Sequence, residues 1–159
     1  MLPRKPARSS LPAVDPFEQG VLRYLARRDR TEAQVRTYLG RTGASPVRIR
    51  QLLERLRHLG YVDDEAVARR LARARLSRRP MGRARLEAEL LALGLARSVT
   101  DPVLDELYRE RSERDLARLL LGRRPPRGRP NERAREAGRL RRYGFSEDTI
   151  QDVLGDDEA

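Results

Sequence analysis

Three acidic residues lie side by side in the segment LGYVDDEAVARRLARARL, which spans residues 59–76. Asp63, Asp64 and Glu65 could bind a divalent cation, because such ions prefer carboxylate oxygens, or they could serve as a general acid and base. They could equally mark the start of a helix, where a carboxylate accepts hydrogen bonds from unpaired backbone N–H groups. The choice between these interpretations decides whether we expect an enzyme.

The residues around these acids favour the helix start. If Asp63 is the N-cap, Val62 and Val67 occupy the two positions of a hydrophobic staple, and Glu65 falls in the first turn. A metal site would need further ligands at fixed spacing, and the sequence contains a single histidine. It also lacks a glycine-rich phosphate loop with its lysine, an H-E-x-x-H and a G-x-S-x-G. We therefore predict that the protein is not an enzyme and needs no metal or cofactor. A metal-dependent hydrolase that uses the two aspartates is a minor alternative.

The composition is strongly basic. The chain has 159 residues and a net charge of +11, and all of its 35 basic residues except Lys5 are arginines. Such an excess favours a polyanion or an acidic protein surface as the partner. The charge is concentrated in residues 17–61 (ten Arg, four acids) and 108–154 (thirteen Arg, eight acids), whereas residues 62–107 are nearly neutral. Because the chain has no cysteine and no apolar run long enough to span a bilayer, we expect a cytoplasmic protein without a membrane partner.

Apolar residues recur at helical spacing, and no useful stretch alternates as a strand would. Several helix starts carry a capping residue. Thr31 opens a capping box, Ser45 precedes a proline at the first helical position, and Ser112 can cap a later helix. In the same way, we expect Asp101 to cap a helix that starts at Pro102.

One signature recurs along the chain. The segments LGRTG (39–43), LLALG (90–94) and LRRYG (140–144) all follow the pattern L-x-x-x-G at the end of a helix, and their glycines are 51 and 50 residues apart. This near-constant spacing indicates tandem units, each too small to bury a sufficient core alone. We therefore predict an all-α fold, an elongated, curved array of three tandem three-helix repeats. The predicted parts are a disordered basic tail (1–15), three repeats (16–61, 62–107 and 108–154, the last with a Pro- and Arg-rich loop at 122–130) and an acidic tail (155–159).

The arginines indicate where a partner would bind. In the helix after Asp64, the residues Arg69, Arg70 and Arg73 fall on one arc, and helical spacing gives only Arg69 an acidic residue four positions before it. We therefore expect an un-neutralised basic surface there, with similar patches on the outer units. Any DNA contact would be to phosphates, because side chains suited to base edges and aromatic platforms are scarce. The predicted surface comprises Arg27, Arg28, Arg69, Arg70, Arg73, Arg79, Arg83, Arg123, Arg124, Arg141 and Arg142.

The sequence also resembles the RecX family of bacterial regulators of the RecA recombinase. The resemblance covers about residues 17–154 and lies in three segments that occur in the family's order: LGYVDDEAVARRLARARL, MGRARLEAELLALGL and YGFSEDTIQDVL. The chain departs from the family pattern at Tyr143, where relatives often carry a basic residue, and in its Pro- and Arg-rich loop. The matched positions include Gly60, Tyr61, Asp63, Asp64, Gly82, Leu90, Gly94, Gly144 and Phe145.

The resemblance implies an elongated helical protein that binds the RecA–DNA filament, in its groove or at its end. It also implies suppression of filament growth, ATP hydrolysis, strand exchange and SOS co-protease action. It brings no catalytic residues, and we interpret the matched positions as turns, caps and packing. We expect a monomer whose partners are the RecA filament and, through phosphate contacts, the DNA within it. The alternative is a helical module that binds nucleic acid non-specifically without RecA.

Overall fold

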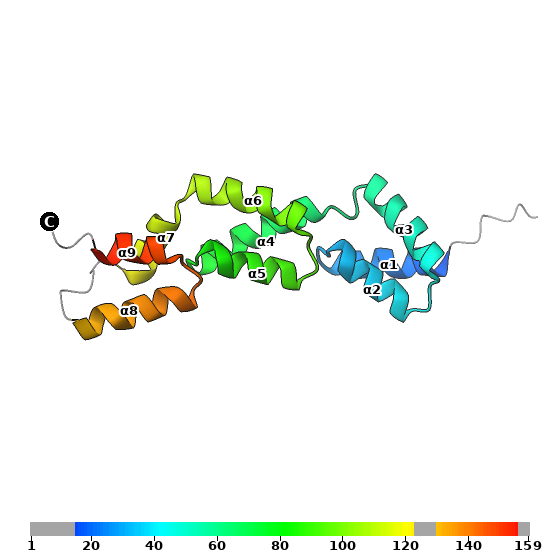
Figure 1. The fold of residues 1–159 in the computed structure, drawn as a ribbon. Helices are drawn as coiled ribbons and strands as arrows, with labels where there is room; N and C mark the ends of the chain where they lie inside the picture. Colours follow the sequence, from blue (N-terminus) through cyan, green and yellow to red (C-terminus); the bar gives the residue numbers. More distant parts are fainter. Residues whose placement is uncertain (1–14, 123–129, 156–159) are drawn as a thin grey trace, which may run out of the picture.

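The computed structural model describes residues 15–122 and 130–155, and within these ranges the chain is entirely helical, without a strand. Figure 1 shows the helices arranged as an elongated row, with the two ends of the chain at opposite ends of the row. The helices are α1 (Pro16–Arg27), α2 (Glu32–Arg41), α3 (Pro46–His58), α4 (Asp64–Arg78), α5 (Arg83–Ala92), α6 (Arg97–Glu110), α7 (Glu113–Leu121), α8 (Pro130–Arg142) and α9 (Glu147–Gly155).

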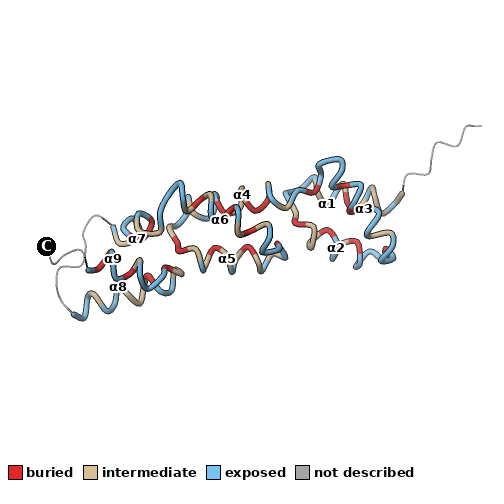
Figure 2. The backbone as a smooth tube through the Cα atoms, turned by 45° about the horizontal axis from the view of Figure 1, so that its top comes forward, coloured by how far each residue is buried: buried red, intermediate tan, exposed pale blue. Residues whose placement is uncertain are grey.

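The buried side chains form three clusters, one for each group of three helices. Figure 2 marks the buried residues along the backbone of this row in red. We call these groups the first unit (α1–α3), the second unit (α4–α6) and the third unit (α7–α9). Each cluster consists mainly of Leu, Val and Ala, which suits thin helical layers. Leu76 and Tyr108 pack against the clusters of both the second and the third unit, so these two units share part of their packing.

Local capping residues explain where most helices begin. The predicted capping box is present, because the Thr31 side chain accepts a hydrogen bond from the Gln34 N–H and the Gln34 side chain accepts one from the Thr31 N–H. Ser45 and Ser112 cap α3 and α7 as predicted. The Asp63 carboxylate accepts a hydrogen bond of 3.0 Å from the N–H of Ala66 at the start of α4. The helix-start interpretation of Asp63 is therefore confirmed.

The predicted start of α6 is wrong. The helix begins at Arg97 rather than at Pro102, with Ala96 as its N-cap, and Asp101 lies inside it. The earlier turn forms because Thr100 is fully buried there and extends the apolar stripe. Pro102 removes one backbone donor, but the carbonyl that loses this bond belongs to the exposed Ser98 and can be hydrated. The helix also continues past the predicted boundary at 107/108 and ends at Glu110.

None of the helices in the described ranges is both long enough and apolar enough to cross a lipid bilayer.

Candidate interaction surface

The units are joined through the ends of their second helices. At the first joint, between the first and second units, the Thr31 hydroxyl donates a hydrogen bond of 2.8 Å to the carbonyl of Leu93, at the end of α5. The backbone N–H of Glu32 donates to Asp64 Oδ1, also at 2.8 Å. The cap hydroxyl of α2 thus meets a carbonyl of the second unit, and the free N–H of Glu32 meets a carboxylate, which is favourable at the positive end of a helix.

The second joint, between the second and third units, repeats this arrangement. The N–H of Gly82 donates to the carbonyl of Tyr143 at 2.8 Å, and the N–H of Arg83 donates to Glu113 Oε1 at 2.6 Å. Tyr143 precedes the turn glycine Gly144 just as Leu93 precedes Gly94, and Glu113 is the first residue of α7 just as Asp64 is the first residue of α4. The helices α2, α5 and α8 therefore follow one another along the row (Figure 1).

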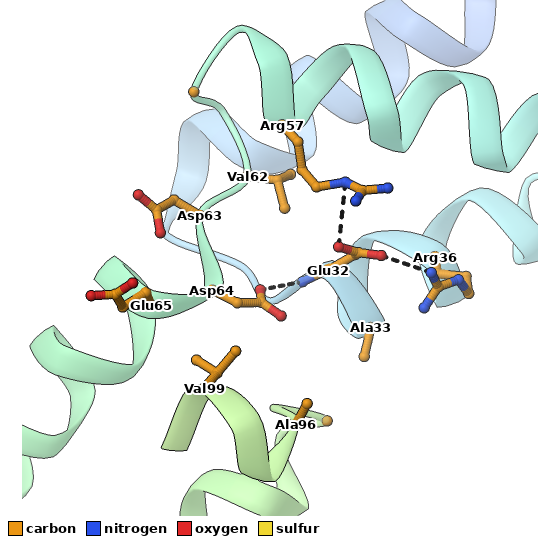
Figure 3. Close-up of a pocket in the computed structure, with 12 residues that line it drawn as sticks. Glu32, Ala33, Arg36, Arg57, Val62, Asp63, Asp64, Glu65, Ala96 and Val99 are labelled. Atoms are coloured by element: carbon orange, nitrogen blue, oxygen red, sulfur yellow. Dashed lines mark hydrogen bonds and ion pairs between the residues drawn. The ribbon is translucent and has the colours of Figure 1, made fainter. Parts of the chain in front are cut away.

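Asp64 has a role that the sequence did not reveal. Its carboxylate points away from its own helix and toward the start of α2, where Figure 3 shows it bonded to the backbone of Glu32. The carboxylate of Glu32 in turn contacts Arg36 at 2.8 Å and Arg57 at 3.6 Å. These residues line a hollow of about 540 Å³ beside the first joint. Asp63 starts a helix, whereas Asp64 holds two units together.

Two substitutions of Asp64 should separate the effect of its charge from that of its hydrogen bond. Burial raises the pKa of the Asp64 carboxyl, and the hydrogen bond from Glu32 only partly opposes this. The folded chain therefore binds this proton more tightly than the unfolded chain does. The contribution of Asp64 to stability consequently decreases as the pH rises from its unfolded pKa through its folded pKa.

We expect Asp64→Asn, whose amide oxygen can still accept from Glu32, to unfold at neutral pH at a temperature equal to or above that of the wild type. The difference should shrink on acidification, when Asp64 becomes neutral in the wild type as well. Asp64→Ala loses the acceptor and should unfold at a lower temperature. Thermal unfolding followed by circular dichroism measures all three chains. An Asn variant less stable than the Ala variant at neutral pH would contradict this account.

Arginines surround Tyr143 at the second joint. Arg79 donates a hydrogen bond of 2.6 Å to the Tyr143 hydroxyl, and its guanidinium carbon lies 5.3 Å from the ring centroid. The guanidinium carbon of Arg85 lies 4.9 Å from the same centroid, and its Nη1 donates to the carbonyl of Arg142 at 3.1 Å. Cations within about 6 Å of a ring centroid are attracted by the ring. Tyr143, which departs from the family pattern, is thus contacted by Arg79 at the end of α4 and by Arg85 of α5, and Arg142 precedes it in the chain.

A fourth arginine reaches this group through a shared acid. Glu89 contacts Arg75 and Arg85, each at 3.3 Å. We call Arg75, Arg79, Arg85 and Arg142 the joint arginine cluster. Within the described ranges, Glu89 is the one acidic residue that forms an ion pair with the cluster. Three of these arginines contact Tyr143 or Glu89, and Arg142 adjoins them through its backbone carbonyl, so arginines outnumber the paired acid in this part of the surface.

The arc of Arg69, Arg70 and Arg73, by contrast, is neutralised, and the expectation of an un-neutralised surface there is wrong. All three side chains contact carboxylates, and most of these lie outside α4, at positions that helical spacing within α4 could not indicate. Arg69, for example, lowers the pKa of the Glu106 carboxyl by donating a hydrogen bond to it. The ion pairs are Arg69–Glu65 (2.9 Å), Arg69–Glu106 (3.1 Å), Arg73–Glu106 (3.4 Å), Arg73–Glu110 (3.0 Å) and Arg70–Asp29 (2.8 Å).

The other predicted arginines divide into three groups. Arg83 pairs with Asp105 at 2.8 Å, and Arg141 pairs with Glu147. Within the described part of the chain, Arg27, Arg28, Arg79 and Arg142 have no acidic partner, while Arg123 and Arg124 lie outside the described residues. The structure adds Arg75 and Arg85, which are not among the eleven residues of the predicted surface. The recurring L-x-x-x-G signature could have indicated them, because it places Tyr143 at the position that docks against the preceding unit.

Most positions matched to the family motif have structural roles. Leu90 and Phe145 belong to the cores, and Gly60, Gly94 and Gly144 have positive φ angles at the ends of helices. Gly82 and Gly94 also permit the close approach of two units. Tyr61 lies in the turn that ends the first unit, where its N–H donates to the Leu56 carbonyl at 2.9 Å. Its side chain is 56% exposed and belongs to none of the three clusters.

The helical row and its joints define the class of this protein. The acids of the DDE segment are engaged in a cap, a joint and an ion pair, and many arginines of the described ranges are exposed, so the chain presents an arginine-rich surface on a helical array. Among residues 15–122 and 130–155, no group of three or more His, Asp or Glu side chains is placed to hold a metal ion. The chain matches the models of the RecX first three-helix domain over residues 21–56 and of the RecX second three-helix domain over residues 63–104.

Whole-chain comparisons agree with these domain matches. The chain is 32% identical over 142 residues to the regulatory protein RecX of Halorhodospira halophila, covering 87% of this chain and 86% of that one. It is 36% identical over 131 residues to the RecX of Syntrophotalea carbinolica, covering 79% and 85%. A RecX from Geobacillus thermodenitrificans is 34% identical, and this chain spans about half (52%) of its length. The chain therefore belongs to the RecX family of regulatory proteins.

The fold agrees as well. The crystal structure of RecX from Lactobacillus salivarius superposes with a TM-score of 0.77 at 20% sequence identity, covering 88% of this chain and 93% of that one.

Proposed function

We propose that this chain regulates RecA by binding the RecA–DNA filament, and that it limits filament growth, ATP hydrolysis, strand exchange and SOS co-protease action. The observation that carries the proposal is membership of the RecX family of regulatory proteins. The joint arginine cluster supports it, because a nucleoprotein filament presents polyanionic DNA as well as protein. We further propose that the chain acts as a monomer in the cytoplasm.

The rate of ATP hydrolysis by RecA on single-stranded DNA tests the proposal directly. Adding the chain at ratios approaching one per RecA should lower the steady-state rate, because a bound regulator that limits filament growth reduces the number of active subunits. The same reaction with the chain heat-denatured controls for ionic effects of a protein of charge +11. An unchanged rate at stoichiometric ratios would refute the proposed function.

The alternative is a helical module that binds nucleic acid without RecA, and the joint arginine cluster is the observation that favours it. This function predicts tight binding to naked DNA, with log affinity falling with log salt by about 0.7 to 0.9 for each phosphate contacted. A chain that binds DNA tightly but leaves RecA turnover unchanged would favour the alternative.

A further inference from the structure

The joint arginine cluster is assembled from two units. Arg75 and Arg79 lie at the end of α4 and Arg85 lies in α5, both in the second unit, whereas Tyr143 and Arg142 belong to the third. Arg85 and Arg79 reach across the joint to the Arg142 carbonyl and the Tyr143 hydroxyl. The cluster therefore exists in this form only when the two units are docked.

Docking brings like charges together. Glu89 offsets one of the three positive charges that the second unit contributes, and the charges that remain repel Arg142 of the third unit as the units dock. The contacts that favour docking include the hydrogen bond from the Gly82 N–H to the Tyr143 carbonyl, at 2.8 Å, and that from the Arg83 N–H to Glu113 Oε1, at 2.6 Å. An anion bound at the cluster would remove the repulsion and leave these contacts unopposed.

The chemistry of the cluster suits phosphates. A guanidinium offers several N–H donors in a planar fork that matches phosphate oxygens, and it stays charged. Arg79 and Arg85 are held in place by the tyrosine ring and by acceptors on the other unit, so less side-chain freedom is lost when an anion binds. A nucleic-acid backbone carries charge at a density that can satisfy several guanidiniums at once, whereas carboxylates on a protein surface are sparser and are often already paired.

We propose that the phosphate backbone of a nucleic acid binds the joint arginine cluster, and that this binding holds the third unit docked against the second. This inference rests on the proposed function in one respect. It takes the DNA of the RecA filament as the nucleic acid that contacts the second joint. The physical basis is linkage: a ligand that binds only the docked arrangement stabilises that arrangement by the free energy of its binding.

Hydrogen exchange at single amides tests the coupling, with the whole chain, a short oligothymidylate and no RecA present. The N–H of Gly82 bonds across the second joint to Tyr143, and that of Glu32 bonds across the first joint to Asp64. We expect the oligonucleotide to slow exchange at Gly82, by up to about 100-fold at a concentration about 100 times its Kd, and to leave Glu32 unchanged. Equal slowing at both amides, or no slowing at Gly82, would overturn the proposal.

A matched pair of variants locates the phosphate site. Arg79 and Arg142 have no acidic partner in the described ranges, so Arg79→Ala with Arg142→Ala releases no carboxylate. Arg23→Ala with Arg50→Ala removes the same charge from exposed, unpaired arginines of the first unit. Loss of two phosphate contacts should lower the slope of log affinity against log salt for the single strand by about 1.4 in the first variant only. Equal slopes in both variants would refute the assignment, and circular dichroism checks that each is folded.

Two further arms distinguish the partner and separate this proposal from the proposed function. We expect poly-glutamate to compete only weakly with the oligonucleotide for the cluster. If poly-glutamate slows exchange at the Gly82 amide more than DNA does, the cluster binds acidic protein segments in preference to nucleic acid, and the proposal fails. The proposed function fails separately, when the wild-type chain leaves RecA turnover unchanged while oligonucleotide binding at the joint persists.

Discussion

Replacing Gly82 with alanine should undock the third unit from the second. A Cβ at this position would lie 2.0 Å from the Gly144 carbonyl oxygen and 2.4 Å from the Phe145 nitrogen, and both are backbone atoms that no side-chain rotation can move away. The joint must therefore open, with loss of the hydrogen bond from Gly82 to Tyr143. Because overpacking of this kind costs roughly 1–3 kcal/mol, we expect a clear drop in the denaturation midpoint and faster amide exchange across the second joint.

The matched control for Gly82→Ala is Gly138→Ala in α8. A Cβ there would meet nothing within 4 Å, so the substitution adds a methyl group in open space on a helix. Replacing glycine by alanine inside a helix is expected to stabilise it by about 0.5–1 kcal/mol, because alanine loses less backbone freedom on folding. The two variants should therefore shift the midpoint of chemical denaturation in opposite directions. If both shifted it upward, the close packing at Gly82 would not constrain the joint.

Reversing Arg69, Arg70 and Arg73 to glutamate should destabilise the fold rather than only remove a binding surface. Each new carboxylate would face the acids that now pair with the arginines, among them Glu106 and Asp29. Attraction between α4 and α6 would become repulsion, so we expect a lower unfolding temperature and partial recovery at high salt, which screens exposed charges. Thermal unfolding at low and high ionic strength measures both effects.

A control with the same change of charge uses Arg23, Arg27 and Arg28. These exposed side chains of the first unit have no ion pair in the described ranges, so their reversal to glutamate breaks no contact between helices. We expect this variant to unfold close to the wild-type temperature. If both triple variants unfolded alike, the ion pairs of Arg69, Arg70 and Arg73 would contribute nothing, and those three arginines would become candidates for the contact surface again.

Much of the fold could be predicted because its signals are local. A cap acts within three residues, so Thr31, Ser45, Asp63 and Ser112 could be identified from their immediate neighbours. The start of α6 could not be identified in this way. Asp101 and Pro102 form a sound local start signal, but burial of Thr100 against the rest of the second unit extends the helix one turn further back.

The contact surface was harder to predict, because the charge of an arginine matters only together with its neighbours in space. The arc on α4 and the cluster around Tyr143 are similar in sequence, since both are arginine-rich segments. The arc is neutralised by acidic residues that lie more than 30 residues away in the sequence, such as Glu106. In the cluster, Arg75 and Arg85 share the single acid Glu89, and Arg85 lies over the ring of Tyr143, about 60 residues further along the chain. No periodicity within one helix carries that information.

The all-helical array could be predicted from the amino-acid sequence, because capping and apolar spacing act over short distances and leave a pattern in the chain, and three motif segments carried the resemblance to the RecX family. It also indicated that Asp63 or Asp64 starts a helix, and the structure identifies Asp63 as the cap. The packing of the units was needed to show that Asp64 joins two of them, that Arg69, Arg70 and Arg73 are paired, and that a cluster with an excess of arginines lies at the second joint. These outcomes depend on which helix ends meet, and that is set by the packing of whole units against one another.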